Sequence, residues 1–345
     1  EVKNLKKLNI ITGKNGSGKS SFLEAIFLIC GAANAGLSMS ISGFRGENRI
    51  HPESDYLFSS IFPNLDVKSK VTIEASSMPV KTHQERSVRK LMITPLLRPD
   101  ILPGRSSTNT RISGVNFRFN GPSGNQTSEV RLNTQMSSNV NPGLPLQQPP
   151  IFVDVQPQPD LINARFVSPY VRELMEQVAD LISSATKAKQ VGRIVEALQL
   201  IEPRIKSILP ITEYGHSSVW VDLDGPVMMP ISSLGSGFYN LLNIVLAIYE
   251  GSSGVVIIDE IEDGLHYTVL PKLSRLLIEA SHKYSAQIFV STHSAEFLHI
   301  LIREAEKLEF NDMSIIRLSK DEPQRSIVFD NNDIAVADEF DAELR

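Results

Sequence analysis

The chain has 345 residues, of which 41% are hydrophobic and 21% are charged, and its formal net charge is −5. This composition predicts a soluble globular protein of one large or two ordinary domains, and the net acidity gives no global indication of nucleic-acid binding. A single cysteine excludes an internal disulfide framework, and we find neither a run of about eighteen apolar residues nor a signal peptide, so we expect a cytoplasmic protein without a membrane partner.

The first predicted element is an apolar strand, LNIIT at residues 8–12, which leads into GKNGSGKSS at 13–21. A helix follows, with apolar residues at helical spacing as far as Cys30. The glycine-rich stretch fits the pattern G-x-x-x-x-G-K-[ST], and its position between a strand and a helix is that of a phosphate-binding loop. A glycine-rich turn with a chance lysine is the alternative, and the complete motif in this context disfavours it.

The loop predicts ATP and Mg²⁺ as ligands. Its glycines let backbone N–H groups wrap a polyphosphate, and the following helix directs its positive end at the same anion. Lys19 would reach the β and γ phosphates, and the Ser20 hydroxyl would bind Mg²⁺. The candidate nucleotide-binding residues of the loop are Gly13, Asn15, Gly16, Ser17, Gly18, Lys19, Ser20 and Ser21.

Residues 31–168 carry mixed signals and are interpreted as inserted strands and loops. A strand is expected within VKSKVTIEAS at 67–76, whereas the Pro-, Ser- and Asn-rich stretch 103–150 predicts loops and short strands around VNFRFN with little packed core. Segment 81–111 has a local excess of positive charge, which could contact a phosphate backbone or an acidic partner, or could be a solvated basic face. Its cations are Lys81, Arg86, Arg89, Lys90, Arg98, Arg105 and Arg111.

Residues 169–210 are predicted to be helical, with Ser168 as the N-cap and Pro169 at the first helical position. This region could pack on the core or project as an arm. The next stretch, SSVWVDLDGPVMMPISS, predicts two strands joined by a turn at Asp224-Gly225. Asp222 and Asp224 could form a metal pair, but the adjacent turn signal favours a plain hairpin.

In SSLGSGFYNLLNIVLAIYE, residues 232–250, small residues precede an apolar helix. Residues Ser233 to Gly237 would therefore lie at a helix N-terminus, which is a second anion-binding end. Many helices begin with Ser and Gly, so this signal has weight only beside the phosphate loop.

The stretch GVVIIDEIEDGLH, residues 254–266, contains a continuous apolar strand of the kind that is buried in a parallel sheet. Asp259 at the end of that strand can hold Mg²⁺. Glu260, one residue further, is placed to orient and deprotonate the water that attacks the γ phosphorus. A plain surface pair of carboxylates is the alternative, which the upstream phosphate loop disfavours.

The same pattern of apolar strand, polar end and helix recurs in AQIFVSTHSAEFLHIL, after the helix TVLPKLSRLLIEASHKY. His293 lies at this strand end, beside Ser291, Thr292 and Ser294. A lone histidine is usually structural, but the carboxyl end of a parallel strand beside a nucleotide site favours a γ-phosphate sensor.

Taken in order, GKNGSGKSS, SSLGSG, VVIIDEIEDGLH and VSTHS resemble the ABC-type ATPase heads of the SMC, Rad50 and RecF group. The likeness is strongest to the OLD-like ATPases of bacterial anti-phage systems, without their Toprim nuclease. It implies an α/β P-loop NTPase fold with a mixed sheet flanked by helices. Residues 1–30 and 211–330 would form the head, 31–168 an insertion and 169–210 a helical subdomain or arm.

The resemblance also implies that two chains sandwich ATP between their heads. Lys19 and Ser20 of one chain would cradle the nucleotide, and the signature residues of the other, best matched by Ser233 and Gly235, would close over the γ-phosphate. Asp263 falls at the position of the D-loop. SLGSG departs from the usual LSGGQ signature, and no glutamine has the clear strand-end context of a Q-loop.

These features favour an ATP-hydrolysing switch that dimerises through ATP and controls a separate effector, a nuclease or toxin, in anti-phage defence. About fifty residues follow His293, too few for a Toprim domain, so any nuclease activity is expected from a partner chain or from residues missing here. The alternative is a DNA-repair or recombination ATPase that binds nucleic acid. That reading needs a positive surface, and only 81–111 offers one. A transporter's nucleotide-binding subunit ranks third.

Overall fold

The computed structural model describes residues 1–46, 56–76, 87–99, 110–132, 151–154, 157–170, 175–283, 285–320 and 326–330. The chain forms two compact units. The first unit combines Glu1–Leu23 with Asn163–Arg345, and the inserted unit is Glu24–Ile162. The division therefore falls at residues 23 and 163, whereas the sequence boundaries were drawn at 30 and 168. Helix α1 (Lys19–Cys30) begins in the first unit and ends in the inserted one.

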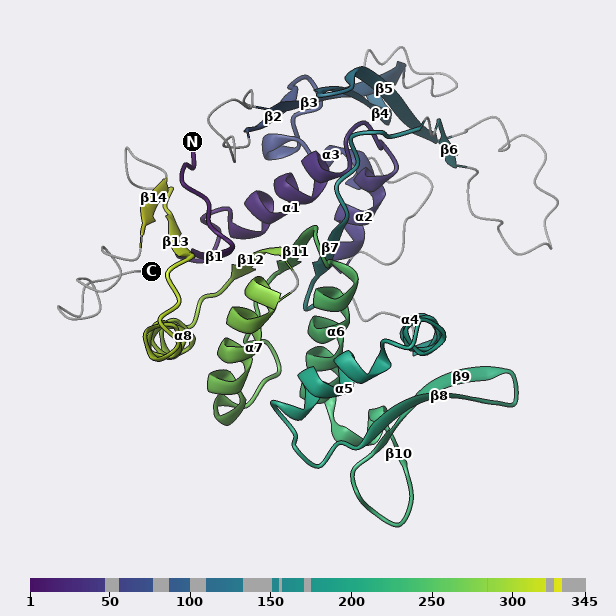
Figure 1. Cartoon of the computed structure of the whole chain (residues 1–345). Coiled ribbons are helices and arrows are strands. Elements are labelled where there is room, and N and C mark those ends of the chain that lie inside the picture. The colour runs from purple at the N-terminus through teal and green to yellow at the C-terminus, as the bar shows by residue number, and fades with distance from the viewer. Residues whose placement is uncertain are drawn as a thin grey trace. The chain divides into compact units, whose positions relative to one another are not determined.

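A six-stranded sheet is the centre of the first unit, with the order β14-β13-β1-β12-β11-β7 (Figure 1). Five strands run parallel, and only β14 is antiparallel to its neighbour. The strands are β1 (Leu8–Thr12), β7 (Ala164–Val167), β11 (Val255–Ile258), β12 (Gln287–Ser291), β13 (Met313–Leu318) and β14 (Ser326–Phe329).

The inner strands of this sheet are apolar without alternation because both of their faces are covered. Every residue of β1 and of β11 is buried, as their continuous apolar runs predicted. Strand β12 separates β1 from β11. Since the five strands are parallel, their carboxyl ends lie along one edge, which is where ligands bind in sheets of this kind.

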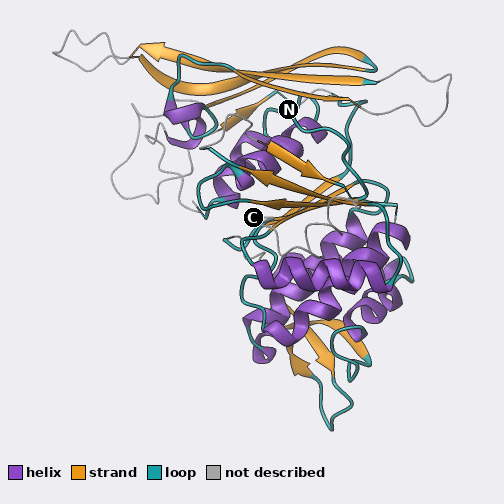
Figure 2. Cartoon of the chain, turned by 90° about the vertical axis from the view of Figure 1, so that its left-hand side faces the viewer, coloured by secondary structure: helices purple, strands orange, loops and turns teal. Residues whose placement is uncertain are grey.

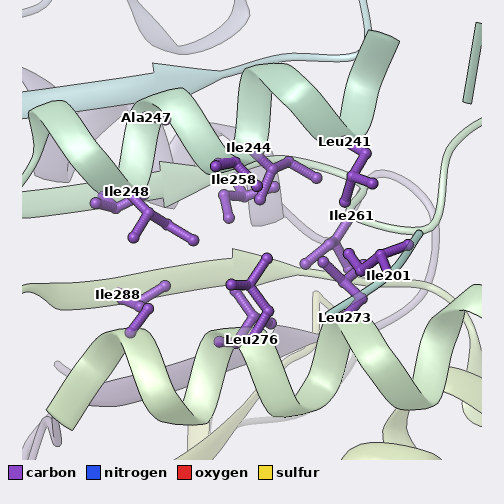
Figure 3. Packing of buried hydrophobic residues seen from close by; sticks show 14 of the residues in the cluster. Ile201, Leu241, Ile244, Ala247, Ile248, Ile258, Ile261, Leu273, Leu276 and Ile288 are labelled. Carbon is purple, nitrogen blue, oxygen red and sulfur yellow. The ribbon is translucent and has the colours of Figure 1, made fainter. Parts of the chain in front are cut away.

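Three helices of the first unit form a layer against this sheet, and Figure 2 shows that layer between the six-stranded sheet and a smaller one. They are α6 (Ser236–Glu250), α7 (Leu270–Lys283) and α8 (Ala295–Lys307). Figure 3 shows Ile244 and Ile248 of α6 pointing towards Leu276 of α7, with Ile258 of β11 and Ile288 of β12 in the same interior. All five side chains are at most 3% exposed, so one apolar core fixes these helices against the strands.

The helical region after β7 packs on this core. Helix α4 (Met175–Lys187) contacts the smaller sheet, and α5 (Val191–Gln199) contacts α6. The described part of α4 starts at Met175, Pro169 and Tyr170 lie in a turn, and residues 171–174 between them lie outside the described ranges. Ser168 accepts a hydrogen bond from the N–H of Tyr170 at 3.2 Å, as an N-cap serine does.

The smaller sheet has the order β10-β9-β8, with strands β8 (Ser207–Glu213), β9 (His216–Asp222) and β10 (Met229–Pro230). The predicted antiparallel pair is confirmed as β9 and β10. Asp222 Oδ1 accepts from the N–H of Asp224 at 2.9 Å, and Asp224 has φ 65°, so these aspartates shape the turn as the hairpin interpretation predicted.

The described part of the inserted unit contains a five-stranded antiparallel sheet of order β2-β3-β4-β5-β6 and, besides the end of α1, the short helices α2 and α3. These elements are β2 (Val71–Ser76), β3 (Val88–Pro99), β4 (Thr110–Gly121), β5 (Gly124–Leu132), β6 (Ile151–Val153), α2 (Leu37–Phe44) and α3 (Tyr56–Ser59). The expectation of little packed core around VNFRFN was wrong. Val115, Phe117 and Phe119 alternate along β4 and are at most 1% exposed, because every second residue faces the core.

Part of the predicted basic segment is engaged within the inserted unit. Arg89 donates to the carbonyl oxygens of Ile29, at 3.1 Å, and Asp160, at 2.6 Å, and lies over the ring of Phe119. Lys90 pairs with Glu74 across β2 and β3. Lys81, Arg86 and Arg105 lie outside the described residues. Arg89 and Lys90 thus already have partners within the inserted unit. These contacts do not favour the alternative in which the basic segment binds nucleic acid.

Candidate functional site

The phosphate loop lies between β1 and α1, as predicted. Gly13, Gly16 and Gly18 have φ values of 134°, 74° and 100°, a region that side chains rarely tolerate. At Gly13 there is also no room, because a Cβ there would lie 2.2 Å from the carbonyl oxygen of Leu318. The turn of the loop therefore requires all three glycines, and the close approach to the end of β13 is a second requirement at Gly13.

Lys19 fills the loop from inside. Its side chain is buried, and Nζ donates to the carbonyl oxygens of Gly13, at 2.8 Å, and Lys14, at 3.4 Å. Ser20 and Ser21 are exposed in the first turn of α1, and Asn15 is exposed on the loop. A phosphate group entering the loop would take over hydrogen bonds that carbonyl oxygens now accept from the amine.

Asp259 and Glu260 follow β11, and a buried serine on the neighbouring strand joins them. Ser291, at the end of β12, is fully buried and donates from Oγ to Asp259 Oδ1. Ser291 Oγ in turn accepts the backbone N–H of Glu260 at 2.8 Å. Ser291 therefore fixes both the carboxylate and the backbone of the next residue. The sequence indicated it only as a neighbour of His293, because a serine at a strand end has no motif of its own.

The environment of Glu260 suits a base. Burial is the main reason that its pKa is raised, and the negative charge of Asp259 adds to the effect, with smaller contributions from Glu262 and Asp263; His293 opposes them. Glu260 also has φ 50°, an uncommon backbone conformation outside glycine that turns the chain sharply at the strand end. A carboxylate with a raised pKa takes up a proton more readily at neutral pH.

His293 lies at the end of β12, and Glu262 holds it there. Its Nδ1 is 3.0 Å from Glu262 Oε1, and that oxygen also accepts the backbone N–H groups of His293, at 2.9 Å, and Ser294, at 3.0 Å. Ser294 caps α8 by accepting from the N–H of Phe297. Glu262 is a second residue that the sequence did not single out. Its signal is weak, since it is one of several acids in DEIED.

The Ser-Gly helix end is formed by a 3-10 turn, Ile231–Leu234, and by Gly235, which has φ 88° and precedes α6. Ser233 and Gly235 are exposed. The start of α6 contacts the segment after β11 at two places. Asn240 Nδ2 donates to the carbonyl oxygen of Asp263 at 3.1 Å, and a Cβ on Gly237 would lie 2.5 Å from the carbonyl oxygen of Gly264. The predicted signature and D-loop segments of one chain are therefore in contact.

The donors at this edge, a carboxylate and a hydroxyl, are oxygen ligands of the kind that Mg²⁺ takes. No group of three or more His, Cys, Asp or Glu residues that could hold a metal is found in the described ranges. Mg²⁺ typically takes one or two protein oxygens and completes its shell with water and phosphate. Asp259 supplies a buried carboxylate, and Ser20 an exposed hydroxyl, which matches that requirement.

Within the described part of the chain, no helix is both long and apolar enough to cross a membrane.

Comparison with known proteins places the chain in a family. Residues 8–299 match the family described as "AAA domain, putative AbiEii toxin, Type IV TA system". A protein of Helicobacter pylori named "ATP/GTP phosphatase" is 22% identical in an alignment of length 336, and the match covers 88% of this chain and 84% of that protein.

Solved structures with a similar arrangement include SMC heads. An SMC head bound to the C-terminal winged-helix domain of ScpA has a TM-score of 0.46 at 14% identity, and the match covers 94% of this chain and 91% of that one. The SMC head domain from Thermotoga maritima has a TM-score of 0.38 at 13% identity, covering 95% and 96% of the two chains.

The family match over residues 8–299 extends from β1 and the phosphate loop, through the carboxylates after β11, to the start of α8. It therefore contains every element of the candidate site. The chain therefore belongs to this AAA-domain family, and it is an ATPase with a P-loop α/β fold.

Proposed function

We propose that the chain binds ATP with Mg²⁺ at the carboxyl edge of the six-stranded sheet and hydrolyses it with Glu260 as the general base. The observation that carries this proposal is the Ser291 bridge, by which Ser291 Oγ holds both the Asp259 carboxylate and the N–H of Glu260. Ser291 ends β12, and β12 lies between β11 and the phosphate-loop strand β1. Preorganised groups of this kind can act without reorganisation at the moment of reaction.

Each residue has a distinct role in this proposal. Lys19 exchanges its loop carbonyl partners for the β and γ phosphates, and Asp259 with Ser20 would hold Mg²⁺, which neutralises phosphate charge when bound. Glu260 orients a water and takes its proton. His293, held by Glu262, faces the γ-phosphate as a donor, in the manner that a strand-end histidine allows.

We further propose that two chains form a composite site, in which Ser233 and Gly235 of one chain close over ATP in the other. The exposure of both residues supports this proposal, because an exposed helix N-terminus can receive an anion. Asp263 would act across the same interface. ATP then favours the dimer because it binds the closed form better than the separate chains.

The switch would control a separate effector, a nuclease or toxin, in anti-phage defence, as the OLD-like motifs suggest. The family's description as part of a toxin–antitoxin system supports a two-component arrangement. Proteins that co-purify with the Glu260→Gln variant in the presence of ATP should include the effector and the signal that triggers it.

The test uses Glu260→Gln, with Glu279→Gln, an exposed glutamate on α7, as the matched charge control. We expect Glu260→Gln to bind ATP, to release phosphate at least about a hundredfold more slowly, and to elute as a dimer with ATP. Phosphate release and light scattering after gel filtration measure these outcomes. Wild-type hydrolysis by Glu260→Gln would exclude the base, and a monomer with bound ATP would exclude the composite site.

A further inference from the structure

The end of β13 lies against the phosphate loop. Strand β13 runs parallel to β1 with Arg317 beside Thr12, so the next residues of both strands leave the sheet at the same edge. Contact between the two segments is close, since a Cβ on Gly13 would lie only 2.2 Å from the Leu318 carbonyl oxygen. The chain after β13 is thereby brought to the predicted phosphate site, although it is distant from it in sequence.

Lys320, two residues beyond β13, brings its amine to the middle of the loop. A Cβ on Gly16 would lie 3.6 Å from Lys320 Nζ. The lysine is exposed, and no carboxylate in the described ranges forms an ion pair with this amine. Strand β13 therefore delivers this lysine to the loop, and no acidic side chain of the described residues draws it there.

The amine of Lys320 adds a positive charge to a place that is already positive. The loop already holds Lys19 inside it, and the start of α1 presents the positive end of a helix to the same space. A further positive charge raises the local potential, which attracts a polyphosphate and repels cations. The arrangement thus favours a more highly charged ligand than the loop alone would select.

We propose that Lys320 is a nucleotide-binding residue that contacts the polyphosphate of the bound nucleotide from the β13 side of the loop. This inference rests on the proposed function, because it adds a residue to that same site. Lys320 lies outside every motif in the sequence, so only the pairing of β13 with β1 reveals it.

The experiment compares Lys320→Gln with Lys7→Gln in the full chain. Lys7 is exposed and precedes β1, so its substitution removes one positive charge at the opposite edge of the same sheet. Calorimetry with AMP-PNP and ADP, and competition by tripolyphosphate, give the affinities. We expect Lys320→Gln to weaken all three about three- to tenfold, Lys7→Gln to change none, and Lys320→Arg to restore binding.

A salt series separates a phosphate contact from a structural effect. The affinity of wild type for AMP-PNP should fall more steeply with salt than that of Lys320→Gln, because one charge contact is missing in the variant. Unchanged affinities in Lys320→Gln, or a loss for AMP-PNP without a loss for tripolyphosphate, would overturn the inference. If Lys19→Ala then still abolishes binding, the proposed function stands without Lys320; a wild type that binds no nucleotide would overturn both.

Discussion

Substitution of Ser291 by alanine tests whether the buried bridge organises the candidate catalytic carboxylates. The hydroxyl is fully buried between the ends of β11 and β12, donates to Asp259 and accepts from the N–H of Glu260. Alanine removes one oxygen and leaves two polar groups without this partner. The change creates little empty space, so the lost hydrogen bonds dominate its effect.

The expected magnitude follows from those two bonds. Leaving a buried polar group unsatisfied costs about 1–3 kcal/mol, so Ser291→Ala should lower the free energy of unfolding by about 2–4 kcal/mol. Because Asp259 and the Glu260 backbone lose their common anchor, ATP turnover should fall about ten- to a hundredfold. Denaturant unfolding measures the first quantity, and phosphate release at saturating ATP the second.

Ser314→Ala is the matched control. Ser314 is also fully buried, lies on β13 of the same sheet, and donates to Asn9 Oδ1 at 2.9 Å, away from the site. It should lower the free energy of unfolding by about 1 kcal/mol and leave turnover unchanged. A folded Ser291→Ala protein with wild-type turnover, or equal loss of turnover in both variants, would refute the proposed role of the bridge.

Two further predictions concern the helix contact and the base. Gly237→Ala should lower the free energy of unfolding by about 1–3 kcal/mol, because its Cβ would lie 2.5 Å from the Gly264 carbonyl oxygen. Gly192→Ala, whose Cβ would have no atom within 4 Å, should instead raise the free energy of unfolding by about 0.5–1 kcal/mol. Denaturant unfolding of both variants measures these changes, and equal effects would contradict the close approach at Gly237. The raised pKa of Glu260 predicts that phosphate release falls on acidification at a higher pH than an ordinary glutamate base would give, because the base must be deprotonated. Because the pKa of Glu260 is higher in the folded than in the unfolded state, its ionised form destabilises the folded protein at high pH. Glu260→Gln should therefore unfold at a higher denaturant concentration than wild type at pH 8, and this difference should shrink towards pH 5 and be absent in Glu279→Gln. A difference that grows on acidification would contradict the raised pKa.

The local patterns of the sequence were sufficient for the elements that short segments specify. The phosphate loop needs glycines at fixed spacing between a strand and a helix, and all three have the positive φ that this requires. Strand β11 is apolar throughout because it is buried on both faces, so its end at Asp259 could be located without the fold. These signals are short in range and chemically specific.

Composition misled where it was used as a substitute for periodicity. The Pro-, Ser- and Asn-rich stretch contains β4, in which Phe117 and Phe119 are buried at every second position. The alternation of VNFRFN is the pattern of a half-buried strand, and its partner β5 supplies the other side of the ladder.

Tertiary structure alone decided which distant residues complete the site. Strand β12 lies between β1 and β11, and this order brings Ser291 to Asp259, 32 residues away in the chain. Pairing of β13 with β1 brings Lys320 to Gly16 in the same way. Such contacts depend on strand order and register, which arise from the packing of the whole sheet and leave no periodic trace in either segment.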